Sequence, residues 1–355
     1  MNHWTKRTVA VLMAGSVIAA GLTGCGSKAI DNSEVVATVN GEEISYGVAN
    51  FSARMNQASV EYYYENMMGS AVGSEMWTSE VEDGVTYEDS VKESIMDSLQ
   101  SLYLIRQHAE ECGVELTEED QTAIEKAVSI FEEDNALEDK ELISGEETYV
   151  KEFLELMTIE QKMRKPMQDG YNTEVSDEEA AQKSMTYVYF KFNTTDEDGN
   201  SVELTDEEKA ELKTKAETFS TTLKNDPTTS IDALAAEYGV EVEVVTFDAE
   251  TTSPNADLIA AADALTAEGQ ATEVIESDYG YYVGQLKSLF DEEATASKKE
   301  AIIEERKEAQ YTALLESWKE EAEVTVNEEV WDKIDFANVG VSYKDSNAEY
   351  DDTTE

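Results

Sequence analysis

Residues 292–321 constrain the fold of this chain more than any other segment, because they predict one long amphipathic helix near its end. The apolar positions of this helix include Ile303, Leu314, Leu315 and Trp318. A helix of this length extends about 45 Å, and its apolar face must be buried against another element. The strand-containing segment before it forms a complete unit without it. We therefore expect the helix to pack on the first part of the chain, so that both chain ends build one lobe.

Residues 35–170 carry mainly helical periodicity after a short β-branched start. The Asn40-Gly41 pair predicts a tight hairpin turn. Ser45 is a suitable N-cap for a first helix, whose apolar face is expected to run from Val48 to Tyr62. Further helices are predicted at 87–112, after Thr117 and at 147–167, with a loop at 67–84.

Residues 171–290 change to an alternation of strands and helices. An aromatic and β-branched run at 185–192 predicts the first strand, and Thr205 with Glu208 forms a capping box that opens a helix. The predicted order is strand, helix, helix, strand, helix, strand, strand. The fold class is therefore α+β: a helical lobe built from both chain ends, with an inserted α+β domain that contains a four-stranded sheet.

The first 24 residues have the composition of an export signal. Lys6 and Arg7 precede an apolar run at 9–22, which has the length of a signal-peptide core and is too short to span a membrane. The run ends in Leu-Thr-Gly-Cys at 22–25, which resembles the lipobox of bacterial lipoproteins. We expect cleavage before Cys25 and a lipid on its thiol as the membrane anchor. The alternative is an apolar segment that ends in a cysteine by chance.

Charge and residue counts exclude several function classes. The chain has 26 Lys and Arg against 79 Asp and Glu, a net charge of -53, so its field repels nucleic acid. After loss of the signal, His108 and Cys112 are the only histidine and the only free thiol expected, which argues against a zinc site and against His-dependent nucleophilic catalysis. The acidic loop at 196–200 fails as an EF-hand because Thr205 occupies the twelfth position. No metal and no cofactor are expected.

Several motifs resemble one known family. The Val-Asn-Gly-Glu-Glu-Ile-Ser sequence at 39–45, Gly269 with Thr272, and the Asp-Tyr-Gly-Tyr-Tyr-Val sequence at 278–283 look like extracytoplasmic foldase lipoproteins of the PrsA type. That family is related to the periplasmic chaperone SurA. The resemblance implies a parvulin-type peptidyl-prolyl isomerase domain, inserted between the two parts of a chaperone lobe. It implies a signal peptide at 1–24, a tether at 25–34, a SurA-like helical chaperone lobe at 35–170, a parvulin-like domain at 171–290, a helix returning to the lobe at 291–335 and an acidic tail at 336–355.

The catalytic pattern of parvulins is missing from the matching positions. Where the family carries two histidines on its first and last strands, this chain has Tyr-Val-Tyr at 187–189 and Gly-Tyr-Tyr-Val at 280–283. The resemblance then implies a degenerate proline or peptide pocket and no confident catalytic residue. The candidates for this pocket are Tyr187, Phe247, Leu258 and Tyr282. The alternative is that aromatic residues on these strands only pack the sheet.

The sequence therefore predicts a membrane-anchored extracytoplasmic chaperone or foldase with little or no isomerase activity. Its partners would be unfolded or nascent secreted polypeptides, and the membrane through the lipid on Cys25. Its location would be the outer face of the bacterial cytoplasmic membrane. The alternatives are an active prolyl isomerase of the parvulin class, and a lipid-anchored solute-binding or scaffold protein.

Overall fold

The chain folds into two compact units. The computed structural model describes residues 17–21, 31–69, 73–195 and 199–343. The first unit is made from Met1–Gly170 and Ala309–Glu355, and the second from Tyr171–Glu308. Both ends of the chain thus contribute to the first unit.

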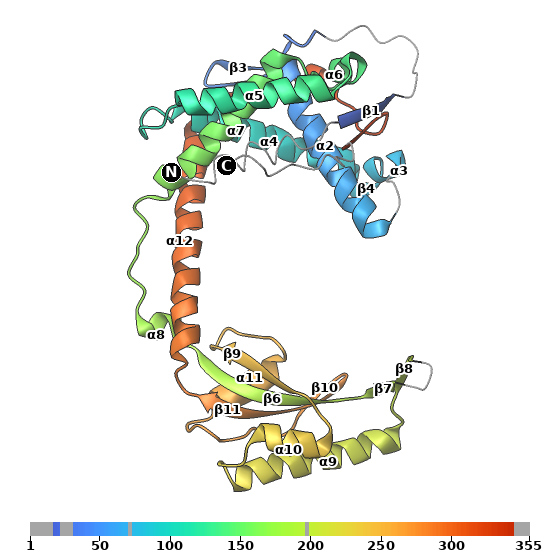
Figure 1. Ribbon diagram of the computed structural model, residues 1–355, viewed down its shortest axis with the longest axis vertical. Helices are drawn as coiled ribbons and strands as arrows, with labels where there is room; N and C mark the ends of the chain where they lie inside the picture. The colour runs from blue at the N-terminus through green and yellow to red at the C-terminus, as the bar shows by residue number, and fades with distance from the viewer. Residues whose placement is uncertain (1–16, 22–30, 70–72, 196–198, 344–355) are drawn as a thin grey trace, which may run out of the picture. The chain divides into compact units, whose positions relative to one another are not determined.

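A small antiparallel sheet opens the first unit (Figure 1). It contains β2 (Val35–Val39), β3 (Glu42–Ser45) and, from the other end of the chain, β12 (Val324–Val326), in the order β12-β2-β3. Asn40 and Gly41 join β2 to β3 with φ angles of 51° and 84°. Positive φ at both central residues is the requirement of a type I′ turn. The hairpin predicted from Asn-Gly is confirmed.

Helices make up most of the first unit. Ser45 caps the first of them by accepting a hydrogen bond from the Val48 N–H, and Thr117 caps a later one through a capping box with Asp120. Two short helices and a small hairpin were missed by sequence reasoning. The helices and the hairpin strands are α2 (Tyr46–Met68), α3 (Ser74–Trp77), β4 (Glu80–Glu82), β5 (Val85–Thr86), α4 (Tyr87–Gln107), α5 (Glu118–Asp134), α6 (Leu137–Ile143) and α7 (Glu147–Gln168).

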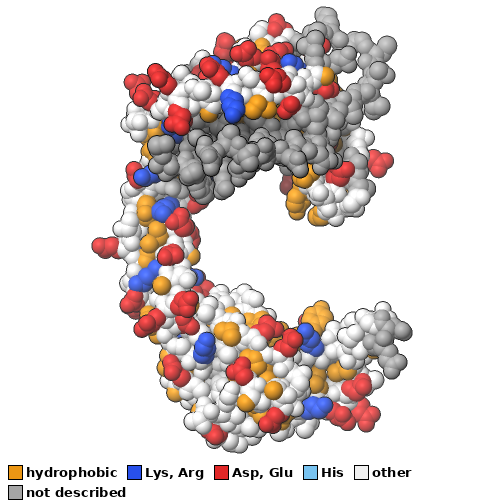
Figure 2. Space-filling view, in the orientation of Figure 1, with side chains coloured by type: hydrophobic (Ala, Val, Ile, Leu, Met, Phe, Trp, Pro, Cys, Tyr) orange, Lys and Arg blue, Asp and Glu red, His pale blue; other side chains and the backbone are white. Residues whose placement is uncertain are grey.

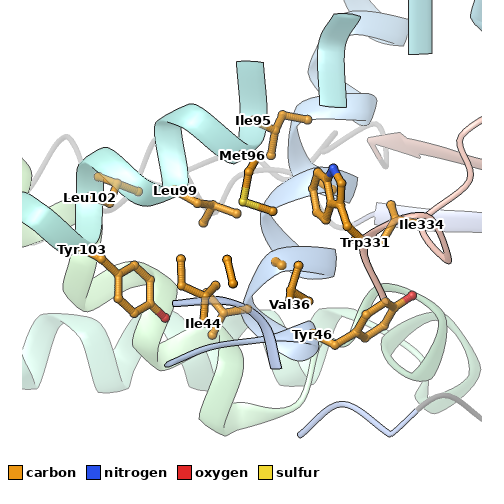
Figure 3. Close-up of a cluster of buried hydrophobic side chains, with 14 of the residues drawn as sticks. Val36, Ile44, Tyr46, Ile95, Met96, Leu99, Leu102, Tyr103, Trp331 and Ile334 are labelled. Carbon is orange, nitrogen blue, oxygen red and sulfur yellow. The ribbon is translucent and has the colours of Figure 1, made fainter. Parts of the chain in front are cut away.

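The main core of the first unit joins the two chain ends. Figure 3 shows Val36 and Ile44 of the sheet, Leu99 of α4, and Trp331 and Ile334 from the C-terminal segment directed toward one another. Each of these five side chains is at most 5% exposed. Trp331 ends α13 (Glu328–Trp331). Burial of apolar groups from segments so far apart in the sequence closes this lobe.

The C-terminal segment is folded further than predicted. An acidic tail was expected from residue 336, but Phe336 is 1% exposed and β13 (Val339–Tyr343) follows it. Buried Arg54 donates to the carbonyl oxygens of Asp335 and Val339, at 3.0 and 3.2 Å. Burial lowers the pKa of Arg54 to about 10. The predicted tail is therefore wrong for residues 336–343, because α2 supplies donors for their backbone; residues 344–355 lie outside the described part of the chain.

A strand from the predicted signal segment pairs with β13. β1 (Val17–Gly21) runs antiparallel to it, with Val17 opposite Tyr343 and Gly21 opposite Val339. The predicted cationic start, the lipobox with Cys25, and the tether up to residue 30 lie outside the described residues. Signal cleavage and lipidation stay predictions.

The long helix α12 (Glu292–Glu321) is shared between the units. Its last part packs on the first unit, where Tyr311 lies in a cluster with Ile105 and Met163. The ring of Trp318 stacks on His108 with centroids 4.1 Å apart. This part of the helix meets the expectation that it returns to the helical lobe.

The first part of α12, up to Glu308, belongs to the second unit, which corrects the predicted boundary at residue 290. Arg306 pairs with Glu179 and donates to the carbonyl oxygen of Glu174, and Lys299 pairs with Asp177. Most of this half of the helix is polar, so ion pairs and hydrogen bonds with residues 172–182 replace the apolar packing that we expected.

The second unit contains the predicted four-stranded sheet, in the order β10-β11-β6-β9. Helices cover both of its faces: α9 and α10 share one buried cluster with the sheet, and α11 shares the other (Figure 1). A β7–β8 hairpin was not predicted. The elements are α8 (Asp177–Ala180), β6 (Lys183–Lys191), β7 (Asn193–Thr195), β8 (Ser201–Glu203), α9 (Asp206–Asn225), α10 (Ile231–Tyr238), β9 (Val242–Phe247), α11 (Ala256–Asp263), β10 (Ile275–Ser277) and β11 (Gly280–Ser288).

Candidate functional site

The structure brings the four predicted pocket residues together in the second unit. Tyr187 of β6, Phe247 of β9 and Leu258 of α11 belong to one buried cluster, and Tyr282 of β11 packs against it. Phe247 and Leu258 are 0% exposed, and Tyr187 is 6% exposed. These three side chains fill the space between α11 and the sheet, so they form core rather than the wall of an open pocket.

The hydroxyl of Tyr187 is committed to a contact across the sheet. It donates to Oε2 of Glu243 at 2.6 Å, and the two residues lie directly opposite each other on β6 and β9. Burial and the neighbouring Glu243 raise the pKa of Tyr187, so the phenol stays protonated at neutral pH. A protonated phenol whose proton is already bonded is not available as a general acid or base.

Tyr189 and Tyr282 form the accessible part of this region. They are paired in register across β6 and β11, and their rings stack with centroids 4.2 Å apart and planes at 13°. Both are half-buried. Gly280 makes room for this stack, because a Cβ there would lie 2.5 Å from the Tyr189 ring. The pair offers a flat aromatic face and no acid, base or nucleophile beyond its phenols.

Asp248 is a partly buried carboxylate near this region, at the end of β9. It accepts hydrogen bonds from Gln182 Nε2 at 2.8 Å and from Thr251 Oγ1 at 2.9 Å, and lies 3.1 Å from Lys298 Nζ. Burial alone would raise the pKa of Asp248, but these donors outweigh burial and lower it. These contacts connect the end of β9 with Gln182, Thr251 and the start of α12.

A different surface, in the first unit, exposes its apolar side chains. Tyr62, Tyr63, Met67 and Met68 at the end of α2 are 54%, 63%, 61% and 67% exposed. We call these four residues the α2 tip. Figure 2 shows hydrophobic side chains gathered at the end of α2. Contiguous exposed side chains of this size mark an interaction site more often than the scattered apolar residues found on every surface.

A ladder of aromatic rings supports the α2 tip from below. Tyr63 meets Tyr64 edge-on at 5.6 Å, Tyr64 meets Tyr87 at 6.3 Å, and Tyr87 stacks on Trp77 at 5.4 Å. Trp77 is 1% exposed and packs against Phe336 at 4.9 Å. The ladder connects the exposed rings to the core, so the tip is presented from a fixed base.

Hydrogen bonds hold the same ladder. Trp77 Nε1 donates to Oε1 of Glu61 at 2.9 Å, and Gln57 Nε2 donates to the same oxygen at 2.8 Å. Burial raises the pKa of Glu61 in spite of these donors. Burial and the hydrogen bond with Tyr64 raise the pKa of Tyr87 to about 12. The Tyr87 phenol is therefore protonated at neutral pH.

Sequence reasoning missed the α2 tip. Tyr62 was expected on the buried face of the first helix but is exposed. A loop was expected at 67–84, but this range contains the end of α2, α3 and β4, and its residues 70–72 lie outside the described residues. The available signal was the Tyr62-Tyr63-Tyr64 run, because three consecutive residues of a helix cannot all face one core.

The described residues contain neither a metal-binding cluster nor a membrane-spanning helix. Within the described ranges, no group of His, Cys, Asp and Glu side chains is arranged to hold a metal ion. No helix in the described part of the chain has the length and hydropathy needed to cross a membrane. Cys112 is half-buried, and burial raises the pKa of its thiol.

Comparison with known proteins gives matches at the level of structure. No family model and no curated protein matches the sequence. The crystal structure of foldase protein PrsA from Streptococcus pneumoniae is 16% identical, with a TM-score of 0.31, and the match covers 73% of this chain and 98% of that chain. The structure describing PEB4 and Cj1289 as SurA-like chaperones of Campylobacter jejuni is 10% identical, with a TM-score of 0.28 and coverage of 82% and 98%.

A third match is PrsA from Bacillus subtilis, at 14% identity and a TM-score of 0.21, covering 85% of this chain and 98% of that one. These three matches have sequence identities of 10–16% and TM-scores of 0.21–0.31.

Proposed function

We propose that this protein is a membrane-anchored extracytoplasmic chaperone that binds unfolded secreted polypeptides and has little or no prolyl isomerase activity. The α2 tip carries the proposal: four large apolar side chains, each more than half exposed, stand on a buried aromatic base. A chain with a net charge of -53 stays soluble while it exposes such a surface.

Binding at the α2 tip would be weak and reversible. Full burial of one large apolar side chain contributes about 1.5–3 kcal/mol, and the ordering of a flexible client offsets part of that gain. A surface of this kind recognises apolar segments without a fixed sequence. Such binding suits a chaperone that holds a polypeptide briefly and releases it for folding.

The second unit is proposed to retain the isomerase fold without its catalysis. The barrier to rotation about a peptide bond is about 18–20 kcal/mol, and an isomerase lowers it by holding the proline ring in an apolar slot. Phe247 and Leu258 fill the space where that slot was predicted, and Tyr187 is bonded to Glu243. The Tyr189–Tyr282 stack could contact a client ring but offers no enclosure.

Anchoring through Cys25 is proposed from the sequence alone. Cells grown with a labelled fatty acid should incorporate the label into the wild-type protein and not into Cys25→Ser. The variant should also leave the membrane fraction. Label retained by Cys25→Ser would overturn the lipid anchor while leaving the chaperone proposal intact.

Two assays on the same purified protein test the function. Light scattering from a thermally unfolded test enzyme should fall when the protein is present, and a proline-peptide assay should show little or no acceleration of isomerisation. The combined variant Tyr62→Ser/Tyr63→Ser/Met67→Ser/Met68→Ser should lose most of the suppression of aggregation. The matched control is Val244→Ser/Tyr279→Ser, which removes exposed apolar side chains from the second unit.

Two outcomes would contradict the proposal. Suppression that survives the α2 tip variant, or is lost equally in the control, would remove the tip as the client surface. Efficient proline-peptide turnover would favour the alternative of an active parvulin-class isomerase.

A further inference from the structure

We propose that the α2 tip selects client segments in which apolar residues are interspersed with Lys or Arg. This inference rests on the proposed chaperone function and specifies its clients. It is carried by the charges of residues 55–91, the segment that contains the tip, which are all negative.

The surroundings of the tip lack an exposed cation in their own sequence. No Lys or Arg occurs between Arg54 and Lys92. Those two bounding residues are 3% and 8% exposed and face the interior. Arg54 donates to Gln57 Oε1 at 2.7 Å, and Lys92 Nζ donates to the carbonyl oxygen of Ile334 at 2.8 Å. Their charges are used to hold the C-terminal segment and are not presented at the surface.

Carboxylates are exposed throughout the same stretch. They are Glu65 on α2, Glu75 on α3, Glu80 and Glu82 on β4, Asp83 in the turn that follows, and Asp89 on α4. None of them forms an ion pair with any residue that the structure describes. Elsewhere many lysines do pair with exposed acids, as Lys319 does with Asp97 and Lys213 with Glu276. The negative charge near the tip is therefore left uncompensated.

Apolar and acidic groups alternate on this surface as well. Val81 is 48% exposed and stands between Glu80 and Glu82 on β4. The register of the hairpin shifts between Glu80 and Glu82, so the exposed valine stands at an irregular point of the strand directly between two exposed carboxylates. A client lysine or arginine can lie with its aliphatic stem along the apolar side chains while its charged end meets a carboxylate.

The same charges disfavour other occupants. An acidic client segment would be repelled by the exposed carboxylates near the tip. A second copy of this chain would bring two uncompensated sets of carboxylates together, and an anionic lipid surface would be repelled. A cationic apolar segment is the partner that would both cover the exposed apolar side chains of the tip and pair with the nearby carboxylates.

A set of three fluorescent peptides tests the proposal by anisotropy. All three carry the same apolar residues, with Lys, Ser or Glu at the intervening positions. The Lys peptide should bind about tenfold more tightly than the Ser peptide, as expected from two or three exposed ion pairs, and the Glu peptide should bind more weakly than either. Raising the salt concentration should reduce the difference between Lys and Ser peptides.

A charge variant with a matched control locates the effect. Glu65→Gln/Glu80→Gln/Glu82→Gln should abolish the preference for Lys while the affinity for the Ser peptide stays the same. Glu207→Gln/Glu211→Gln/Glu217→Gln removes the same number of charges from exposed positions of α9 and should keep the preference. Tryptophan fluorescence, to which the buried Trp77 contributes, verifies that the first variant is folded.

Each other result has a defined meaning. Equal affinity for the Lys and Ser peptides, or a preference that the α2 and β4 variant retains, would overturn the charge selection and leave the chaperone proposal standing. Failure of all three peptides to bind, together with no suppression of aggregation, would overturn the chaperone proposal itself. A dimer in sedimentation that the α2 tip variant dissociates would assign the surface to a second copy and overturn the client assignment.

Discussion

Two tyrosine-rich regions of this molecule differ in what surrounds them. In the second unit, Tyr187 is 6% exposed and its hydroxyl is bonded to Glu243. At the α2 tip, Tyr62 and Tyr63 are more than half exposed, and only the rings beneath them are buried. The same residue type therefore serves as core in one region and as open surface in the other.

The difference arises from coverage by neighbouring elements. α11 lies over the face of the sheet that carries Tyr187, and Leu258 closes the space between them. α2 continues beyond Ala58, which is fully buried, into turns where large apolar residues face solvent. The resemblance to parvulins predicts a pocket in the covered region near Tyr187. The exposed side chains of the α2 tip favour the tip instead as the proposed client surface.

The largest effect is expected from Phe247→Ala. This side chain is 0% exposed, so its loss should cost about 3–5 kcal/mol of the free energy of unfolding of the second unit. Urea unfolding followed by far-UV circular dichroism should show the loss. Tryptophan fluorescence should be unchanged, because residues 171–308 of the second unit contain no tryptophan. Val244→Ala on the same strand is the control, because Val244 is 59% exposed. A small effect of Phe247→Ala would mean that the region is open and could hold a client ring.

Acid should weaken the second unit through Asp248. Its pKa is lowered in the folded state, so its contribution to stability is present above the unfolded pKa of about 3.9 and is lost as pH falls through the lower folded value. Asp248→Asn should therefore be less stable than wild type at pH 7, and the difference in urea midpoint should shrink toward pH 3. A difference that does not depend on pH would refute the role of its charge.

Replacing a half-buried aromatic side chain should lower the free energy of unfolding less than replacing a fully buried one. Trp318→Ala should reduce the stability of the first unit by about 2 kcal/mol, roughly half the value for a core aromatic, because Trp318 is half-buried between the His108 ring and the cluster that contains Tyr311. Calorimetry of the variant should show a lower transition for the first unit only. Loss of the whole lobe would mean that α12 contributes more than its described contacts explain.

Tyr187→Phe distinguishes packing from polar function. The change removes one hydrogen bond to Glu243 and keeps the ring, so it should cost about 0.5–1.5 kcal/mol. The residual rate of proline-peptide isomerisation should not change. A reduced rate at unchanged stability would show that the phenol takes part in catalysis.

The smallest effect on stability is expected at the tip. Met68→Ser changes a side chain that is 67% exposed, and surface substitutions of this kind usually alter stability by less than about 0.5 kcal/mol. Client binding should nevertheless weaken. A large loss of stability would mean that Met68 packs in the native state, which would remove the contrast between the two regions.

Short sequence motifs predicted those parts of the fold that are determined by residues close together in the sequence. Asn40-Gly41 specified its turn through backbone conformation, and Thr205 with Glu208 specified the start of α9 through reciprocal hydrogen bonds. The succession of strands and helices along the second unit followed from the alternation of patterns. In each case the interacting groups are adjacent in sequence, so their chemistry could be identified without the fold.

Features that depend on distant partners could not be predicted in this way. Phe336 is buried because Trp77 and Glu88, about 250 residues earlier, supply a ring contact and a hydrogen-bond acceptor. The exposure of Tyr62 depends on which elements fail to cover α2. Phe247 and Leu258 are buried because α11 packs on the face of the sheet that carries them, a contact between elements that the sequence pattern does not specify.

The pairing of β1 with β13 has a consequence for export. One side of β13 is held by α2, where Val339 accepts a hydrogen bond from Gln57 Nε2 at 2.7 Å, and β1 pairs along the strand as well. Cleavage before Cys25 would remove β1 and leave an uncharged, proline-free strand edge at 339–343. Unprotected edges of this kind add extended segments from other chains. Maturation would then do more than release the protein from its leader, because it would create a template for strand addition that the precursor keeps closed.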